Sequence, residues 1–282
     1  MLPLRPLGMI CREEASMPDD GGGGGTPLRI SLWNLLYRIV SSNDHSRTAW
    51  GAILRGSCLA FFKEPIDDLP SSDNDASRRS LKEIFFRIPD YRVYDLYEFL
   101  LADDRAEVKE ADRKLIRRGL NRVLEEESAP VRLLRDRFVP LPDELGLDAV
   151  LTAEGKLTLF DLDAAGRHLQ SAVGFLSRRP DPAGGEAVRE ALIAVAAVVH
   201  TLAGGSGEVA LGTIAPVAGT LGISPELARG IESILGYCHA VSGLPGSERV
   251  HPVDMAEASC LVVVCSSVIN LLLSRTGGKS PE

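Results

Sequence analysis

Residues 254–274 read Asp-Met-Ala-Glu-Ala-Ser-Cys-Leu-Val-Val-Val-Cys-Ser-Ser-Val-Ile-Asn-Leu-Leu-Leu-Ser, and this stretch decides the fold. Asp254 is a suitable helix N-cap, and Glu257 stands at the capping-box position three residues later. The 16 residues from Ala258 to Leu273 are uncharged. A membrane span needs about 20 predominantly apolar residues, and serine and asparagine side chains interrupt this shorter run. We therefore expect no membrane insertion, but the central helix of a bundle or a dimer interface.

Further helix signals precede this segment. Apolar side chains recur at helical spacing in residues 163–178 and 186–202. Ser224 followed by Pro225 is a strong start signal, because serine caps the free N–H groups and proline fits the first helical position. Residues 156–276 are therefore expected to form an all-α unit.

The composition of the chain is that of a globular protein. Its 282 residues are 45% hydrophobic and 25% charged, which excludes global disorder and leaves enough chain for two domains. The net charge of −8 argues against general coating of nucleic acid or anchoring to an anionic membrane, but it leaves room for a local basic site. Five cysteines without a C-x-x-C pair indicate the reducing environment of the cytoplasm.

Charged residues are concentrated in the first part of the chain. Residues 1–155 hold 22 basic and 27 acidic side chains, whereas residues 156–282 hold 9 and 12. This contrast predicts two folding units with a boundary near residue 155. Five consecutive glycines at 21–25 predict a disordered N-terminal tail, in which we find no targeting signal. The expected organisation is a tail at 1–26, a helical domain at 27–155, a second helical domain at 156–276 and a tail at 277–282.

The charge-rich half is also expected to be helical, which makes the whole protein mainly all-α. Apolar residues recur at helical spacing in residues 28–40, 80–87 and 93–101. The aromatic side chains of the last of these segments are expected to be core. A short apolar stretch at 138–141, limited by prolines, is the only extended segment we expect. Asp143 is expected to cap a helix after it.

A long helix is expected over residues 107–124, with apolar residues on one arc and basic residues on the other. A basic stripe of this kind could contact RNA phosphates. The alternative is a solvated face, balanced by the acidic residues around it. The candidate RNA-binding residues are Lys114, Arg117, Arg118 and Arg122.

Several short motifs occur in a fixed order in this half. They are Leu32-Trp33-Asn34-Leu35-Leu36, Tyr91 to Phe99, Leu120-Asn121, Glu125 to Ser128, Phe138-Val139-Pro140 and Asp143-Glu144. Together they span most of residues 28–153, and their order resembles the AbiJ-type N-terminal domain of bacterial abortive-infection proteins. The resemblance implies a helical domain in a phage-defence (antiviral) protein. It supplies no catalytic signature for this half, which is compatible with sensing or regulation.

A second set of motifs lies in the apolar half. It comprises His168-Leu169, Ser177 to Pro180, Glu190-Ala191, Gly236-Tyr237, Cys265-Ser266 and Ile269 to Leu271. These pieces resemble the abortive-infection C-terminal domain, an all-α unit grouped with HEPN proteins. HEPN ribonucleases typically use an arginine and a histidine four to six residues later, brought together across a dimer. The resemblance implies a homodimer, here through the last helix, and RNA cleavage without a metal. In that chemistry the arginine stabilises phosphate charge and the histidine moves a proton.

The chain departs from this family where relatives often carry Gly-x-Arg-His before the last helix. Here Gly243-Leu244 is followed by Pro245-Gly246, and the nearest replacements are Arg249 and His251. His239, near the end of the preceding helix, could face the loop that bears them. The candidate catalytic residues are Arg249, His251 and His239.

The alternative is a catalytically degenerate binding or regulatory module that acts through dimerisation or a partner protein. The loss of the usual Arg-His pair favours it, and the apolar last helix offers a surface. Cys238 and His239 lack a second ligand pair at metal spacing, so we expect no metal and no cofactor. His168 is expected on a helix surface. The chain has no Walker phosphate loop, zincin motif, serine elbow or DNA-binding motif.

Overall fold

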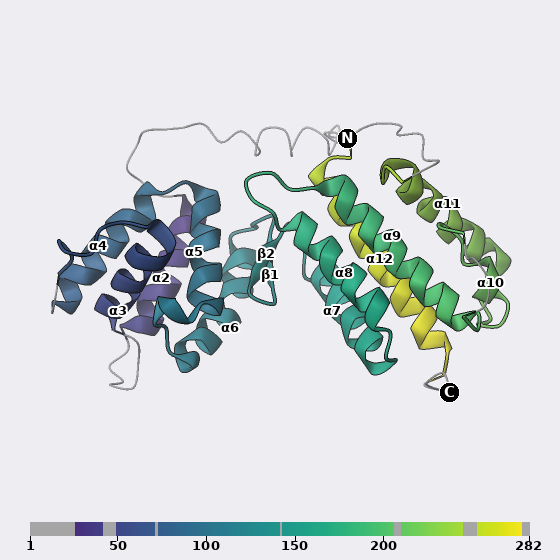
Figure 1. The fold of residues 1–282 in the computed structure, drawn as a ribbon, viewed down its shortest axis with the longest axis horizontal. Helices are drawn as coiled ribbons and strands as arrows, with labels where there is room; N and C mark the ends of the chain where they lie inside the picture. The colour runs from purple at the N-terminus through teal and green to yellow at the C-terminus, as the bar shows by residue number, and fades with distance from the viewer. Residues whose placement is uncertain are drawn as a thin grey trace, which may run out of the picture.

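The computed structural model describes residues 26–41, 49–70, 73–141, 143–205, 210–244 and 253–277. Within these ranges the protein is mainly α-helical, as the sequence predicts. Figure 1 shows two groups of helices side by side along the long axis of the molecule, with a small hairpin between them.

Each group consists of helices that are consecutive in the chain. The first group comprises α2 (Pro27–Val40), α3 (Trp50–Gly56), the π-helical turn η2 (Ser57–Phe62), α4 (Asn74–Arg87), α5 (Asp90–Ala102), the 3-10 turn η3 (Asp104–Ala106) and α6 (Glu110–Glu126). The second group comprises α7 (Glu144–Leu159), α8 (Asp163–Leu176), α9 (Gly184–Leu202), α10 (Ala215–Ala218), α11 (Pro225–Val241) and α12 (Met255–Arg275).

Side-chain caps fix the starts of several helices where the sequence predicts them. Asp143 accepts a hydrogen bond from the backbone N–H of Gly146 at 2.7 Å, and Asp254 accepts one from Glu257 at 2.8 Å. Ser224 caps α11 in the same way. These bonds satisfy N–H groups that a helix leaves free in its first turn.

The first hydrophobic core is built from α2 to α6 and is rich in aromatic side chains. Trp33, Trp50 and Phe85 are almost completely buried there. Tyr97, in the aromatic segment expected to be core, is fully buried, and its hydroxyl donates a hydrogen bond to the Leu32 carbonyl at 2.7 Å. Burial raises the pKa of Tyr97, so the phenol stays a neutral donor.

The second core is built around α12, which packs against α7, α8, α9 and α11. The first residue of α9, Gly184, lies so close to α12 that an added Cβ would be 3.1 Å from the Cβ of Ala258. The hydroxyls of Ser259 and Ser266 donate to backbone carbonyls one turn earlier in the same helix. These two hydroxyls are thus satisfied within their own helix, which lets them lie in the centre of a bundle.

Among the described residues, α12 is the one helix that is long and apolar enough to cross a membrane by length and composition. The other helices bury 56% of its most apolar 18-residue window. Its exposed positions include Cys260 and Ser267. Burial on this scale is what a core helix shows. The dimer interface expected through this helix concerns its exposed remainder and stays a prediction, as does the expected lack of membrane insertion.

The link between the two groups is a hairpin of β1 (Arg132–Leu134) and β2 (Arg137–Val139), paired antiparallel. The turn residues Arg135 and Asp136 both have positive φ. The sequence predicts one extended segment near 138–141, so β1 is an additional strand. It escapes sequence reasoning because its turn lacks the glycine or asparagine that such φ values favour.

The two faces of the hairpin belong to different cores. Leu133 and Phe138 lie opposite each other and pack in the first core, whereas Leu134 and Val139 pack in the second. Successive side chains of a strand point to opposite faces. The hairpin therefore lies between the two cores and contributes side chains to both.

Helix α7 crosses the position expected to separate two domains. Residue 155 lies inside this helix, and the buried side chains of α7, such as Val150 and Leu157, belong to the second core. The division of the chain at residue 155 stays a prediction. The location of the boundary depends on whether α7 is assigned to the first or to the second domain.

Candidate functional site

The predicted catalytic residues fall at the end of α11 and in the segment that follows it. His239 lies in the last turn of α11, where it is half-buried and where a cation complements the helix dipole. Its backbone carbonyl accepts a hydrogen bond from the Ser242 hydroxyl at 2.8 Å. Arg249 and His251 lie outside the described residues, and their catalytic role stays a prediction.

A phenol–carboxylate pair joins α11 to α12 two residues before His239. The Tyr237 hydroxyl donates a hydrogen bond to Oε1 of Glu257, in the first turn of α12. This bond raises the pKa of Tyr237 to about 12, with burial and the charge of Glu257 acting in the same direction. Tyr237 therefore stays protonated near neutral pH and can serve as a hydrogen-bond donor, but not as a general base.

The same two helices hold a pair of buried thiols. Cys238 of α11 and Cys265 of α12 are fully buried and hydrogen-bonded to each other. The hydrogen bond from Cys238, together with burial, raises the pKa of Cys265. A thiol held protonated in the core packs like a small apolar side chain and is a poor nucleophile.

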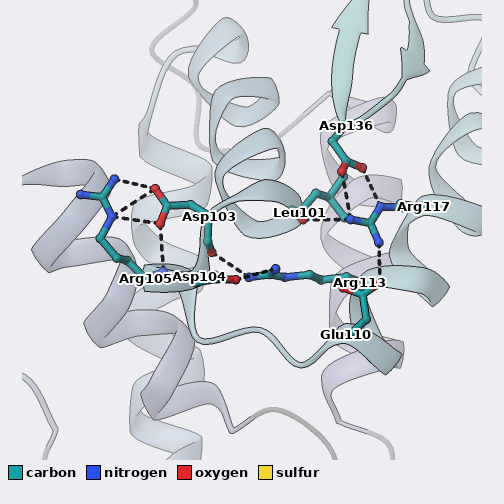
Figure 2. Close-up of polar contacts among 8 residues, drawn as sticks. All are labelled: Leu101, Asp103, Asp104, Arg105, Glu110, Arg113, Arg117 and Asp136. Carbon is teal, nitrogen blue, oxygen red and sulfur yellow. Dashed lines mark hydrogen bonds and ion pairs between the residues drawn. The ribbon is translucent and has the colours of Figure 1, made fainter.

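Two of the four basic side chains expected to form a stripe on α6 are bonded to carboxylates of the same protein. The helix begins at Glu110, three residues later than expected, because Glu107 has a positive φ. Figure 2 shows the Arg117 guanidinium donating to both carboxylate oxygens of Asp136, at 2.6 and 2.9 Å, and to Glu110 at 3.0 Å. A further bond reaches the Leu101 carbonyl at 3.0 Å. The hydrogen bonds to Asp136 raise the pKa of Arg117.

The other three cations of this stripe differ in their surroundings. Arg122 pairs with Glu126 one turn later, at 2.7 Å, on the surface. Lys114 and Arg118 are exposed, and neither has an ion pair with another residue in the described part of the chain. Two of the four predicted RNA-binding residues are thus neutralised by neighbouring carboxylates. RNA binding by the stripe stays a prediction.

The turn before α6 contains a second ion network, also drawn in Figure 2. Arg105 donates to the two carboxylate oxygens of Asp103 at 2.9 and 2.5 Å. The hydrogen bonds from the Arg105 side chain and backbone lower the pKa of Asp103 to about 2. From α6, Arg113 donates to Asp104 at 3.1 Å and to the Asp103 carbonyl at 2.7 Å. Ion pairs within the turn and with Arg113 of α6 therefore stabilise its conformation.

One arginine connects the two groups of helices. Arg179, between α8 and α9, donates to Asp95 at 2.7 Å and to Glu98 at 2.5 Å, both on α5. Its third bond goes to the Phe138 carbonyl at 3.1 Å, while the Phe138 N–H donates to Glu98 at 2.7 Å. Burial opposes the charge of Arg179, but its bonds to the two carboxylates outweigh burial and raise its pKa. We call Arg179, Asp95, Glu98 and the Phe138 backbone the interhelical clamp.

His168, expected on a helix surface, has a more specific setting than that. Its Nδ1 lies 2.7 Å from Oε2 of Glu190, across α8 and α9, and Arg189 Nε is 3.8 Å from the other oxygen. The histidine is 37% exposed and the carboxylate 17%. A carboxylate that holds one ring nitrogen orients the other for proton transfer. No motif reveals this pair, because the residues meet only through the packing of α8 on α9.

Two shallow cavities lie away from all of these histidines. One, of about 310 Å³, lies between α3 and α4 and is lined by Arg55, Asp73 and other residues. The other, of about 180 Å³, is lined by α7 and α8, including Asp163 and Arg167. Within the described ranges, no group of three or more histidine, cysteine or acidic side chains is arranged to hold a metal ion.

Comparison with known proteins identifies the first half of the chain. Residues 26–154 match a family model described as AbiJ N-terminal domain 4. No curated protein and no solved structure gives a significant match. The AbiJ-type N-terminal domain predicted from the ordered motifs is confirmed, whereas the HEPN-like domain predicted at 156–276 stays a prediction.

Proposed function

We propose that this chain is an abortive-infection protein that acts in defence against phage in the bacterial cytoplasm. The observation that carries the proposal is the AbiJ N-terminal domain at residues 26–154. The domain is joined to a second helical group by the shared hairpin and by the clamp of Arg179. Such a junction suits a protein in which one part senses infection and the other responds.

Phage challenge tests this proposal directly. Cells that express the chain should yield fewer plaques than cells with an empty vector, and their cultures should collapse at high phage-to-cell ratios. This pattern is the signature of a response that sacrifices the infected cell. Equal plaque numbers and equal survival across a panel of phages would argue that the chain has no role in defence.

The finer proposal is that the second helical group responds by cutting RNA without a metal, as a homodimer formed through α12. His251 or His239 would take the proton of a ribose 2′-hydroxyl, and Arg249 would stabilise the charge on the phosphate. Its support is the location of His239 in the last turn of α11, directly before the segment that carries Arg249 and His251. The 2′-oxygen would attack the phosphorus while the bond to the 5′-oxygen breaks, and the protonated histidine would return its proton to that oxygen, so the products would be a 2′,3′-cyclic phosphate and a 5′-hydroxyl.

The alternative is a non-catalytic module that acts on a partner protein or through dimerisation. The sequence Gly243-Leu244-Pro245-Gly246 supports it, because an Arg-His pair is missing there. Half-buried Val264 and Leu271 on α12 could contribute to a contact surface.

One pair of assays separates the two. Purified protein is incubated with RNA in the presence of EDTA, as wild type, as the double variant Arg249→Ala/His251→Ala and as His239→Ala. His200→Ala serves as the matched control, because His200, like His239, is half-buried in the last turn of a helix but lies on α9. Cleavage that the double variant abolishes and the control retains supports the ribonuclease. Intact RNA, together with full phage protection by the double variant, supports the non-catalytic module.

A further inference from the structure

Positive charge is concentrated on three helices of the AbiJ domain. Helices α2, α3 and α4 together contain seven basic residues and two acidic ones, in a chain whose net charge is −8. The basic residues are Arg29, Arg38, Arg55, Arg78, Arg79, Lys82 and Arg87, and the acidic ones are Asp75 and Glu83. Two of the basic residues are already paired, because Arg29 is buried against Asp90 and Arg87 lies 3.9 Å from Glu64.

A stack of aromatic rings leads from the core to this basic surface. Trp33 and Trp50 are stacked with their ring centres 5.6 Å apart, and Trp50 and Tyr37 are stacked at 6.4 Å. The two tryptophans are buried, whereas Tyr37 is 41% exposed. The guanidinium of Arg78 lies over the Tyr37 ring, 5.6 Å from its centre. The outermost member of the stack is therefore the planar guanidinium group of Arg78.

A second cation lies over the same aromatic cluster one turn along α4. The ammonium group of Lys82 is 5.9 Å from the centre of the Phe86 ring, and Phe86 contacts Trp33 at 6.3 Å. Lys82 and its neighbour Arg79 are exposed and have no ion pair with a described residue. Arg78 has one weak partner, Asp75, at 3.5 Å. The positive charge of this surface is therefore largely uncompensated.

Exposed rings and guanidinium planes beside free cations form the combination that holds single-stranded nucleic acid. Bases stack on the flat groups, and the cations contact the phosphates. A duplex offers its phosphates but keeps its base faces covered, and an acidic peptide needs the cations but not the rings. We propose that Tyr37, Arg78, Arg79 and Lys82, on α2 and α4, form a binding site for single-stranded RNA or DNA.

This site is separate from the predicted catalytic residues. Figure 1 places α4 at one end of the molecule and α11 near the other, on opposite sides of the hairpin. The inference goes beyond the proposed function, because it assigns a ligand to the AbiJ domain and does not require RNA cleavage. The site would let this domain respond to nucleic acid while the second group carries out the response.

Fluorescence anisotropy with the full chain tests the proposal. The probes are labelled uridine and deoxythymidine oligonucleotides of roughly 12 nucleotides, within the span that single-strand sites cover. The deoxy probe lacks the 2′-hydroxyl, so its binding is measured independently of any cleavage. Comparison of the two probes shows which sugar the site prefers.

The variants separate stacking from charge. Tyr37→Ala is expected to weaken binding by about 5- to 100-fold, because the Arg78 guanidinium loses the ring that holds it as a flat stacking surface, whereas Tyr37→Phe should retain most of the affinity. The double variant Arg79→Gln/Lys82→Gln should reduce the slope of log affinity against log salt by about 1.4, for two phosphate contacts. The matched control is Arg167→Gln/Arg275→Gln on α8 and α12, which removes two exposed cations of the second helical group and should leave affinity unchanged.

Several results would overturn the proposal. They are a lack of saturable binding to either probe, an equal loss in the control variant of α8 and α12, and competition by a duplex or a polyglutamate peptide as effective as that by the single strand. Circular dichroism confirms that each variant is folded. If Tyr37→Ala fails to fold, the surface variant of Arg79 and Lys82 still decides the question, because neither side chain is part of the core.

Discussion

Removal of Arg179 should loosen the contact between the two groups of helices. The guanidinium bonds to Asp95, Glu98 and the Phe138 carbonyl, and the side chains of Arg179 and its two charged partners are each less than a quarter exposed. In Arg179→Met the methionine keeps much of the apolar stem, but the two carboxylates lose their partner in a partly desolvated place. The loss of one partner, more than the loss of packing, sets the cost.

The magnitude follows from the burial of the pair. Breaking a fully buried ion pair costs about 3–5 kcal/mol, and the partial exposure of this cluster reduces that to about 2–4 kcal/mol. With an m-value of about 2 kcal/mol/M in urea, the midpoint of unfolding should fall by about 1–2 M. Arg178→Met is the matched control. Arg178 is exposed and lies over the Phe175 ring, so its loss should cost below about 1 kcal/mol.

The assay uses the location of the two tryptophans. Trp33 and Trp50 both lie in the first core, so tryptophan fluorescence follows that core, whereas circular dichroism follows the helices of both. In Arg179→Met the fluorescence and dichroism curves should separate as the midpoint falls. Coincident curves with the midpoint of the Arg178→Met control would refute the view that the clamp couples the two groups.

Three further predictions concern single side chains. Phe138→Ala should lower the free energy of unfolding by about 3–5 kcal/mol, measured in urea, because a fully buried ring of the shared hairpin is lost. By NMR, the carboxyl of Asp103 should have a pKa of about 2, and in Arg105→Gln this pKa should lie nearer its ordinary value. Because the pKa of Asp103 is lower in the folded than in the unfolded protein, its ionisation stabilises the fold at pH values above the unfolded pKa, and this stability is lost as the pH falls through about 2. Tyrosinate absorbance should place the pKa of Tyr237 at about 12, and nearer 10 in Glu257→Gln. Because the pKa of Tyr237 is higher in the folded than in the unfolded protein, the protonated phenol stabilises the fold at pH values below the unfolded pKa, and this stability is lost as the pH rises through about 12.

Local signals made much of the helical architecture predictable. Asp143, Ser224 and Asp254 each cap a helix at the position expected from the residue itself, because a cap bonds to an N–H only two or three residues away. The aromatic side chains after Asp90 are predicted to be core. Tyr97 is fully buried, as predicted, whereas the prediction is wrong for Tyr91, which is 42% exposed. Spacing within a helix and its first turn is information that a single sequence contains.

Contacts between distant segments were beyond the reach of these signals. The clamp joins Arg179 to residues more than 80 positions earlier, and the partner of Arg117 is Asp136 in a turn without glycine. Helical periodicity correctly put Arg117 on the polar arc of α6, yet it could not tell a solvated cation from one bonded to a carboxylate of the hairpin. The same limit hid the pairing of His168 with Glu190. Each of these depends on how the helices pack.

Packing also explains why the total charge is a poor guide to the ligand of this protein. On α6, carboxylates from the hairpin turn and from the helix itself neutralise Arg117 and Arg122. On α4, Lys82 has no ion pair with a described residue, and its ammonium group lies over the Phe86 ring. An excess of acid elsewhere weakens long-range attraction of nucleic acid, but it is screened over about 10 Å at moderate salt. The charge that a strand would meet is therefore that of the local surface, which is positive.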